Sequence, residues 1–170
     1  MSPEDEGEKI YYGTIMKKLR DLFKEKGTHI HLEITANKVF SNELKSYVPR
    51  GKEIIFLFLK QAPPDITGFV KGSRLPGFVV VEVKSGKISL SDIYQLKRYA
   101  DLFDARFSFL VSLEEIPEEI KRLVSTILLL SKLKCGDIYK AFVFVHFDRE
   151  SNEFVEWFEE NPFKESIYWK

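Results

Sequence analysis

The chain has 170 residues, 44% of them hydrophobic and 31% charged, and a formal net charge of zero at pH 7. This length predicts a single domain over residues 1–170 that is long enough to bury a core. The longest aliphatic run, Ile127 to Leu130, is too short to cross a bilayer and the first residues lack a signal-peptide pattern, so we expect a cytoplasmic protein with no membrane partner. The single cysteine, Cys135, excludes an internal disulfide and a metal site of clustered cysteines.

The first predicted element is an amphipathic helix over residues 8–26, which Gly27 ends. The residues expected to face the core are Ile10, Ile15, Leu19, Leu22 and Phe23. From the residues alone, Glu8 is interpreted as a surface carboxylate that favours the helix N-terminus.

Residues 29–34 alternate strictly, so His29, His31 and Glu33 are predicted to share one face of a strand. A polar outer face is one interpretation. A metal or active-site role for Glu33 or a histidine is the other, because imidazoles two residues apart on a strand can chelate a metal.

The next segment, residues 35–52, predicts a loop with a short helix, and the apolar run 53–59 predicts a strand that leads into Pro63-Pro64-Asp65. The basic residues of this loop, which are candidates for contacts with backbone phosphates, are Lys38, Lys45, Arg50 and Lys52.

Two apolar strands are predicted next, at residues 66–70 and 78–84, separated by turn residues rich in glycine and proline. Side chains two apart on a strand point to the same side, so Glu82 and Lys84 emerge together at the end of the second strand. Pairing of the two strands as a hairpin would bring Asp65 across from Glu82.

A helix is predicted after these strands, because Ser89 or Ser91 followed by Asp92 is a capping pattern. Gln95 and Tyr99 are four residues apart and share one face of this helix. The apolar stripe on the neighbouring face consists of Ile93, Leu96, Ala100 and Phe103.

The remaining elements are a strand at 107–111, a helix at 117–133 and a strand at 141–147. Acidic residues suit the start of that helix, namely Glu114, Glu115, Glu118 and Glu119. Residues 141–170 are expected to form a C-terminal hairpin and aromatic extension, with 148–152 as the turn. The aromatic residues of this extension are predicted to pack on their own domain, and a homodimer contact is the alternative.

Pro64-Asp65, the strand ending in Glu82-Val83-Lys84 and the following Gln95-x-x-x-Tyr99 together resemble the PD-(D/E)XK nuclease superfamily. The Q-x-x-x-Y helix is similar to the subgroup that includes the RecB nuclease domain and the CRISPR-associated exonucleases. The resemblance covers roughly residues 55–112 and implies an α/β fold, a restriction-endonuclease-like three-layer core with a mixed central sheet flanked by helices.

The resemblance also implies a site for Mg²⁺ or Mn²⁺, which prefer hard oxygen ligands. Asp65 and Glu82 would ligate the metal, with the backbone carbonyl of Val83 as a third ligand, and Glu8 is the candidate for the acid that this family carries on its first helix. Lys84 would orient the attacking water and stabilise the charge that develops on the phosphate. The fourfold cysteine set of some related nucleases is absent, so we expect no iron-sulfur cluster.

The two helix residues complete the candidate catalytic set, since by resemblance Gln95 braces the site and Tyr99 either supports Gln95 or contacts nucleic acid. Each member also has a structural interpretation. Glu82 and Lys84 could form a simple ion pair, Gln95 could be an exposed helix residue and Tyr99 could be a core aromatic with a hydrated hydroxyl.

Charge is unevenly distributed along the chain: residues 9–98 contain 17 basic and 8 acidic residues, whereas acidic residues predominate before and after them. A positive excess around the motifs is what a phosphate-binding surface requires, although ordinary solvated faces would give the same count. The candidate nucleic-acid-binding residues are Lys71, Arg74, Lys87, Lys97 and Arg98.

The sequence therefore predicts a metal-dependent deoxyribonuclease, either an exonuclease or a structure-selective endonuclease. DNA is the expected partner and RNA the alternative. A nuclease-fold protein that binds nucleic acid or a protein partner without cutting it is the second hypothesis.

Overall fold

The computed structural model describes residues 3–72, 76–126 and 140–169, with side chains described from residue 7 onward. Its strands are β1 (His29–Ile34), β2 (Ile66–Lys71), β3 (Gly77–Lys84), β4 (Phe107–Ser112), β5 (Ala141–Asp148) and β6 (Glu153–Phe158). Its helices are α1 (Pro3–Glu25), α2 (Asn42–Ser46), α3 (Ile55–Leu59), α4 (Leu90–Phe103), α5 (Glu118–Thr126) and the 3₁₀ turn η1 (Ser166–Tyr168).

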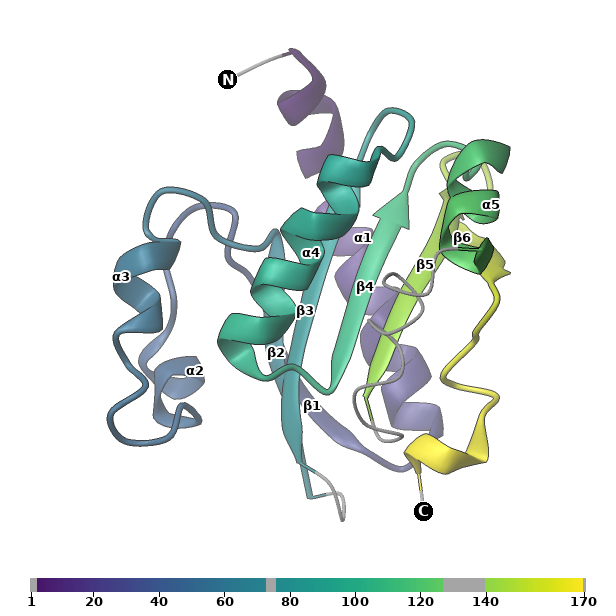
Figure 1. The fold of residues 1–170 in the computed structure, drawn as a ribbon. Coiled ribbons are helices and arrows are strands. Elements are labelled where there is room, and N and C mark those ends of the chain that lie inside the picture. Colours follow the sequence, from purple (N-terminus) through teal and green to yellow (C-terminus); the bar gives the residue numbers. More distant parts are fainter. Residues whose placement is uncertain (1–2, 73–75, 127–139, 170) are drawn as a thin grey trace.

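Within the described residues the strands form one mixed sheet in the order β1-β2-β3-β4-β5-β6. The pairs β3-β4 and β4-β5 are parallel, and the other three pairs are antiparallel. In Figure 1, α1 lies behind the sheet and α4 and α5 lie in front of it. This arrangement confirms the predicted three-layer α/β fold with a mixed central sheet.

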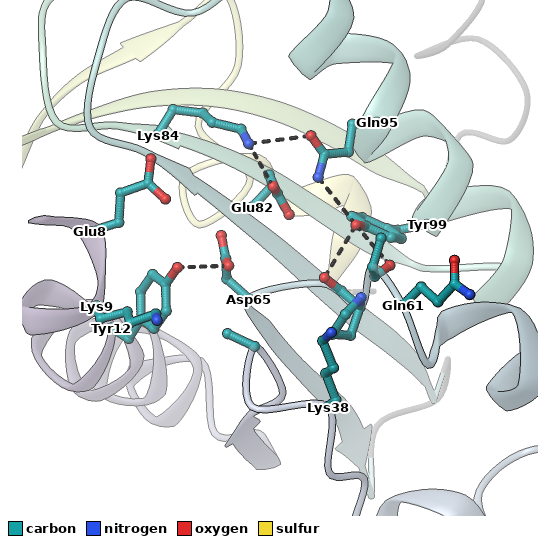
Figure 2. A pocket seen from close by; sticks show the side chains of 13 residues that line it. Glu8, Lys9, Tyr12, Lys38, Gln61, Asp65, Glu82, Lys84, Gln95 and Tyr99 are labelled. Atoms are coloured by element: carbon teal, nitrogen blue, oxygen red, sulfur yellow. Dashed lines mark hydrogen bonds and ion pairs between the residues drawn. The ribbon is translucent and has the colours of Figure 1, made fainter. Parts of the chain in front are cut away.

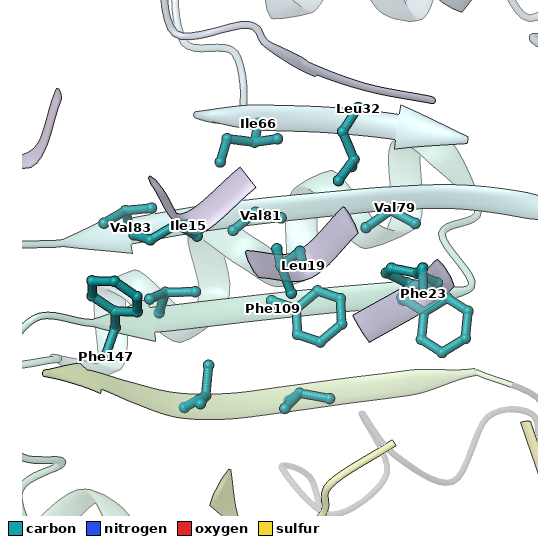
Figure 3. Packing of buried hydrophobic residues seen from close by; sticks show 14 of the residues in the cluster. Ile15, Leu19, Phe23, Leu32, Ile66, Val79, Val81, Val83, Phe109 and Phe147 are labelled. Atoms are coloured by element: carbon teal, nitrogen blue, oxygen red, sulfur yellow. The ribbon is translucent and has the colours of Figure 1, made fainter. Parts of the chain in front are cut away.

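The central strands are apolar on both faces because each face is covered. One core lies between the sheet and α1, together with the C-terminal segment (Figure 3), and a second lies between the sheet and the helices of the other layer. All side chains of β4 are buried, as the continuous apolar pattern of a parallel strand requires. None of the described helices has the length and apolar composition needed to cross a bilayer.

One predicted residue of the first helix is misplaced: Ile10 is 73% exposed rather than buried. The inward stripe of α1 runs instead through Tyr12, Ile15, Leu19 and Phe23, which recur every three or four residues. Ile10 lies two positions before Tyr12, about 200° around the helix axis, and therefore faces away from the sheet.

The predicted strand at 53–59 is wrong, because this segment contains the short helix α3. Ile55 and Leu59, four residues apart, are buried on its inner side, whereas Leu57 and Phe58 are exposed. A short apolar run does not by itself distinguish a buried strand from one turn of a buried helix. The strand that pairs with β2 on this side of the sheet is β1.

The two predicted hairpins are confirmed, since β2 pairs with β3 and β5 pairs with β6 in antiparallel register. The C-terminal aromatics pack on their own domain, as Phe163 and Tyr168 are buried against the α1 side of the sheet. The short helix in the 35–52 loop is also observed, as α2. The predicted helix at 117–133 is present as α5 to Thr126, and residues 127–133 lie outside the described residues.

Candidate active site

The residues of the motif line a cavity of about 430 Å³ at the end of the sheet where β2 begins and β3 ends (Figure 2). It lies between α1 and α4, with the loops that follow β1 and α3 completing its wall. The residues that line it are Glu8, Lys9, Tyr12, Ala36, Lys38, Gln61, Ala62, Pro63, Asp65, Glu82, Lys84, Gln95 and Tyr99.

Asp65 is held in the cavity at the residue that precedes β2. The register pairs Ile66 with Val81, so Asp65 lies across from Glu82, as the sequence predicted. Its carboxylate accepts two hydrogen bonds, one at Oδ1 from the Tyr12 hydroxyl (2.7 Å) and one at Oδ2 from the backbone N–H of Val83 (2.8 Å). These two donors fix the orientation of a side chain that is only 9% exposed.

Glu82 and Lys84 lie on the same side of β3 because they are two residues apart. Lys84 Nζ lies 2.8 Å from Glu82 Oε1 and 3.6 Å from the carboxylate of Asp92. The other carboxylate oxygen, Glu82 Oε2, is buried and has no hydrogen-bond partner among the described residues. A buried oxygen of this kind is costly unless a cation, a proton or a water satisfies it.

Burial, with a smaller contribution from neighbouring carboxylates, raises the pKa of both carboxylic acids. Burial is the main cause at Asp65, where the pKa rises to about 6 despite the two hydrogen bonds. At Glu82, burial and then the charge of Asp65 raise the pKa to about 8, which the ion pair with Lys84 offsets only in part. At Lys84, burial opposes the charge, but Glu82, Asp92 and Asp65 outweigh burial and raise the pKa of the ammonium.

Gln95 and Tyr99 connect α4 to the cavity. Gln95 Oε1 accepts a hydrogen bond from Lys84 Nζ (3.2 Å), and Gln95 Nε2 donates to the Tyr99 hydroxyl (3.2 Å). The Tyr99 ring is fully buried in the core, and its hydroxyl lies 3.1 Å from the carbonyl oxygens of both Ala62 and Pro63. Tyr99 thus supports Gln95 and anchors the loop that leads to Asp65.

The first helix contributes Glu8 to the same cavity, where its Oε1 accepts a hydrogen bond from the backbone N–H of Ser85 (2.7 Å). Tyr12, which sequence reasoning missed, lies one turn further along α1. Both belong to the inward stripe of the helix, so extending the core periodicity past the end of the sheet would have found Tyr12.

The donor set fits a hard divalent cation only in part. Mg²⁺ and Mn²⁺ prefer carboxylate oxygens, which Asp65, Glu82 and Glu8 supply in this cavity. One of these oxygens, Glu82 Oε2, is buried and unpaired among the described residues. The N–H and C=O of one strand residue point to the same side, so the Val83 carbonyl faces the Asp65 side of β3. No three His, Cys, Asp or Glu side chains among the described residues form a ready-made metal group, so a bound ion would also need this carbonyl or waters.

The candidate nucleic-acid-binding residues that the structure describes do not line the cavity. Lys71 lies at the opposite end of β2 from Asp65, roughly 20 Å along the strand, and pairs with Glu43 at 2.5 Å. Lys97 pairs with Asp101, and Arg98 lies over the Tyr99 ring. Lys87 is exposed in the loop after β3, and Arg74 lies outside the described residues. The basic residues that do line the cavity are Lys9, Lys38 and Lys84.

The polar face of β1 forms an ion-pair cluster. His31 Nε2 lies 2.9 Å from Glu33 and its Nδ1 lies 3.5 Å from Glu43, while Glu33 also accepts the backbone N–H of Ser41 at 2.9 Å. Because both imidazole nitrogens face carboxylates, this arrangement corresponds to the polar-face interpretation of the strand and not to a metal site.

Comparison with protein-family models, with curated proteins and with solved structures gives no match for this chain. A function for this chain therefore has to follow from the cavity and from the chemistry of the residues that line it.

Proposed function

We propose that the chain is a divalent-metal-dependent nuclease of the PD-(D/E)XK type that hydrolyses phosphodiester bonds of DNA. The observation that carries the proposal is the meeting of Asp65, Glu82 and Lys84 in one cavity, with Glu82 Oε2 left unpaired among the described residues. Two buried carboxylates with raised pKa values and an adjacent ammonium are costly for stability, and such groups concentrate at functional sites.

Hydrolysis of a phosphodiester requires a positioned water and compensation of the charge that builds on the phosphoryl oxygens. A divalent cation, when bound, supplies Lewis-acid polarisation and lowers the pKa of a coordinated water. Asp65 and Glu82 would hold that cation, with Glu8 and the Val83 carbonyl as further oxygen donors.

Lys84 contributes an ammonium beside these carboxylates. Its Nζ is oriented by Glu82 and Gln95, so it can donate a hydrogen bond to the attacking water or to a phosphoryl oxygen without first reorganising. Gln95 in turn is held by Tyr99, whose ring is immobilised in the core. The roles of Gln95 and Tyr99 are therefore to position Lys84 and the Asp65 loop.

The test is incubation of the purified protein with labelled single-stranded, duplex and branched DNA and with RNA, in Mg²⁺, Mn²⁺ or chelator. We expect cleavage of DNA that chelator abolishes. Asp65→Asn, Glu82→Gln and Lys84→Ala should each lower the rate by at least about 100-fold.

Matched controls are available on the surface. Glu119→Gln at the start of α5 and Lys24→Ala near the end of α1 change exposed charges outside the cavity and should cut at the normal rate. Normal turnover in a folded Asp65→Asn or Glu82→Gln variant would reject the proposed roles. Binding of DNA without cleavage in every metal condition would favour a nuclease-fold protein that does not cut.

A further inference from the structure

Lys38, in the loop between β1 and α2, has a left-handed backbone conformation with φ of 67°. This region is unfavourable for residues with a side chain, and glycine, asparagine and aspartate are the ones that usually adopt it. A lysine there is held against its own preference by the surrounding structure. Left-handed residues occur at turns and helix caps, as Asn152 and Asp104 do here, and they also cluster at functional sites.

The turn that holds Lys38 is tied to the motif itself. The backbone N–H groups of Thr35 and Ala36 both donate to the carbonyl oxygen of Asp65, at 2.8 and 3.1 Å, and the buried Thr35 hydroxyl donates to the carbonyl of Pro64 at 2.6 Å. The N–H of Lys38 then closes the turn on the carbonyl of Thr35 at 2.8 Å. The turn that holds Lys38 is therefore tied to the backbone of Pro64 and Asp65.

The side chain of Lys38 reaches the cavity from this loop, on the side away from Lys84 (Figure 2). The two ammonium groups differ in their surroundings. Lys84 is neutralised by Glu82 and Asp92, whereas Lys38 has no ion pair or side-chain hydrogen bond among the described residues. Lys38 is thus a cation at the cavity wall that is available to an anionic ligand.

From this the geometry points to Lys38 as a residue that contacts a backbone phosphate of the substrate strand and positions that strand at Asp65 and Glu82. The inference rests on the proposed function and adds to it a substrate contact that the motif does not contain. Lys38 lies at the wall of the cavity and is exposed, so its side chain is accessible to an incoming strand. A lysine with this φ lowers the folding stability relative to glycine, and the contact with a substrate phosphate is what its side chain would contribute in return.

The decisive variant is Lys38→Gly, because glycine relieves the strained φ while removing the charge. Relief of strain should raise the midpoint of thermal unfolding by about 2–4 °C. Binding of a labelled single-stranded DNA oligonucleotide, measured by fluorescence anisotropy in EDTA, should weaken about three- to tenfold at low salt. The slope of log affinity against log salt should fall by about 0.7, the value for one lost phosphate contact. In Mg²⁺, KM should rise more than kcat falls.

Two further variants separate charge from conformation. Lys38→Arg keeps the charge and should retain both the affinity and the salt slope. Asn152→Gly places glycine at a similar left-handed conformation, φ of 55°, in the β5-β6 turn outside the cavity; because asparagine already tolerates this region, the midpoint should change little and binding should not change.

The inference would be overturned if Lys38→Gly bound the oligonucleotide with an affinity within about twofold of the wild type and with the same salt slope. If the wild-type protein nevertheless cleaved DNA, the proposed function would remain intact. Absence of both binding and cleavage in the wild-type protein would overturn the inference and the proposed function together.

Discussion

The Tyr12 hydroxyl donates a 2.7 Å hydrogen bond to Oδ1 of Asp65, and this bond joins the first helix to the start of β2. Tyr12 is 4% exposed, so the bond is shielded from water. Burial and the charge of Asp65 raise the pKa of the Tyr12 phenol, which therefore remains a donor at all physiological pH values. The aspartate is thus oriented by α1 as well as by the backbone of β3.

Removal of this bond by Tyr12→Phe should weaken the site more than the fold. We expect a loss of about 1 kcal/mol in the free energy of unfolding, the usual contribution of a hydrogen bond. The rate of Mg²⁺-dependent cleavage should fall about tenfold, because Asp65 loses one of the two donors that orient it. Tyr11→Phe is the matched control, since Tyr11 packs on Phe147 outside the cavity. Equal rates for the two variants would contradict a role for Tyr12 in positioning Asp65.

The raised pKa values predict how stability depends on pH in the metal-free protein. Glu82 has a pKa of about 8 in the folded state, above its usual value, so the folded state binds more protons than the unfolded state between these values. The stability contributed by protonated Glu82 is therefore present at acid pH and lost as the pH rises through about 8. Asp65 acts in the same direction up to its pKa of about 6.

Glu82→Gln removes this dependence at one position. Denaturant unfolding in EDTA should show the variant gaining about 4 kcal/mol relative to the wild type between about pH 5 and pH 8.5, at roughly 1.4 kcal/mol for each pH unit between the two pKa values. Millimolar Mg²⁺ should shrink the difference at high pH by stabilising the ionised wild-type site. A difference that does not change with pH would mean that the Glu82 carboxyl group is not buried as described.

The sequence predicted that the motif residues lie together, but not what surrounds them, for a physical reason. The period-two rule placed Glu82 and Lys84 together, and the hairpin register followed from the turn residues, so both depended on local geometry. Tyr12 follows the helical period of the buried stripe of α1, but only the tertiary packing shows that its hydroxyl meets Asp65. Lys38 reaches the cavity through an unusual backbone conformation, which no spacing rule reports. The α3 segment failed because apolar runs of this length fit either a strand or a helix turn.

Tyr99→Phe tests whether α4 braces the Asp65 loop. The variant keeps the buried ring but removes the hydroxyl that contacts the Ala62 and Pro63 carbonyls and accepts from Gln95. We expect the free energy of unfolding to fall by about 1–2 kcal/mol, because buried carbonyls lose a donor, and the cleavage rate to fall while oligonucleotide affinity is retained. Tyr94→Phe, on the exposed side of the same helix, is the control. A wild-type rate in Tyr99→Phe would limit Tyr99 to a packing role.

The helical form of residues 55–59 can be tested by two neighbouring substitutions. Leu59 is 1% exposed and Phe58 is 70% exposed. In a helix, Leu59 lies on the same inward face as Ile55, four residues earlier, whereas Phe58 points away from that face. Leu59→Ala should destabilise the protein by about 2–4 kcal/mol, whereas Phe58→Ala should change the free energy of unfolding by less than about 0.5 kcal/mol. Equilibrium denaturation of both variants measures this, and a larger loss for Phe58→Ala would contradict the burial pattern of α3.

Gly68 in β2 is the position where the fold tolerates a side chain least. A Cβ atom there would lie 2.5 Å from Cδ2 of Leu32 and even nearer to the backbone oxygen of His31, and the backbone of β1 cannot move away without breaking its pairing with β2. Gly68→Ala should therefore reduce the free energy of unfolding by about 3 kcal/mol or more. Gly13→Ala is the matched control, because a Cβ in α1 meets nothing within 4 Å and alanine is the better helix former, so stability should rise by up to about 1 kcal/mol. Calorimetry of the two variants compares them directly, and a stable Gly68→Ala protein would contradict the close β1-β2 pairing that places Asp65 at the cavity.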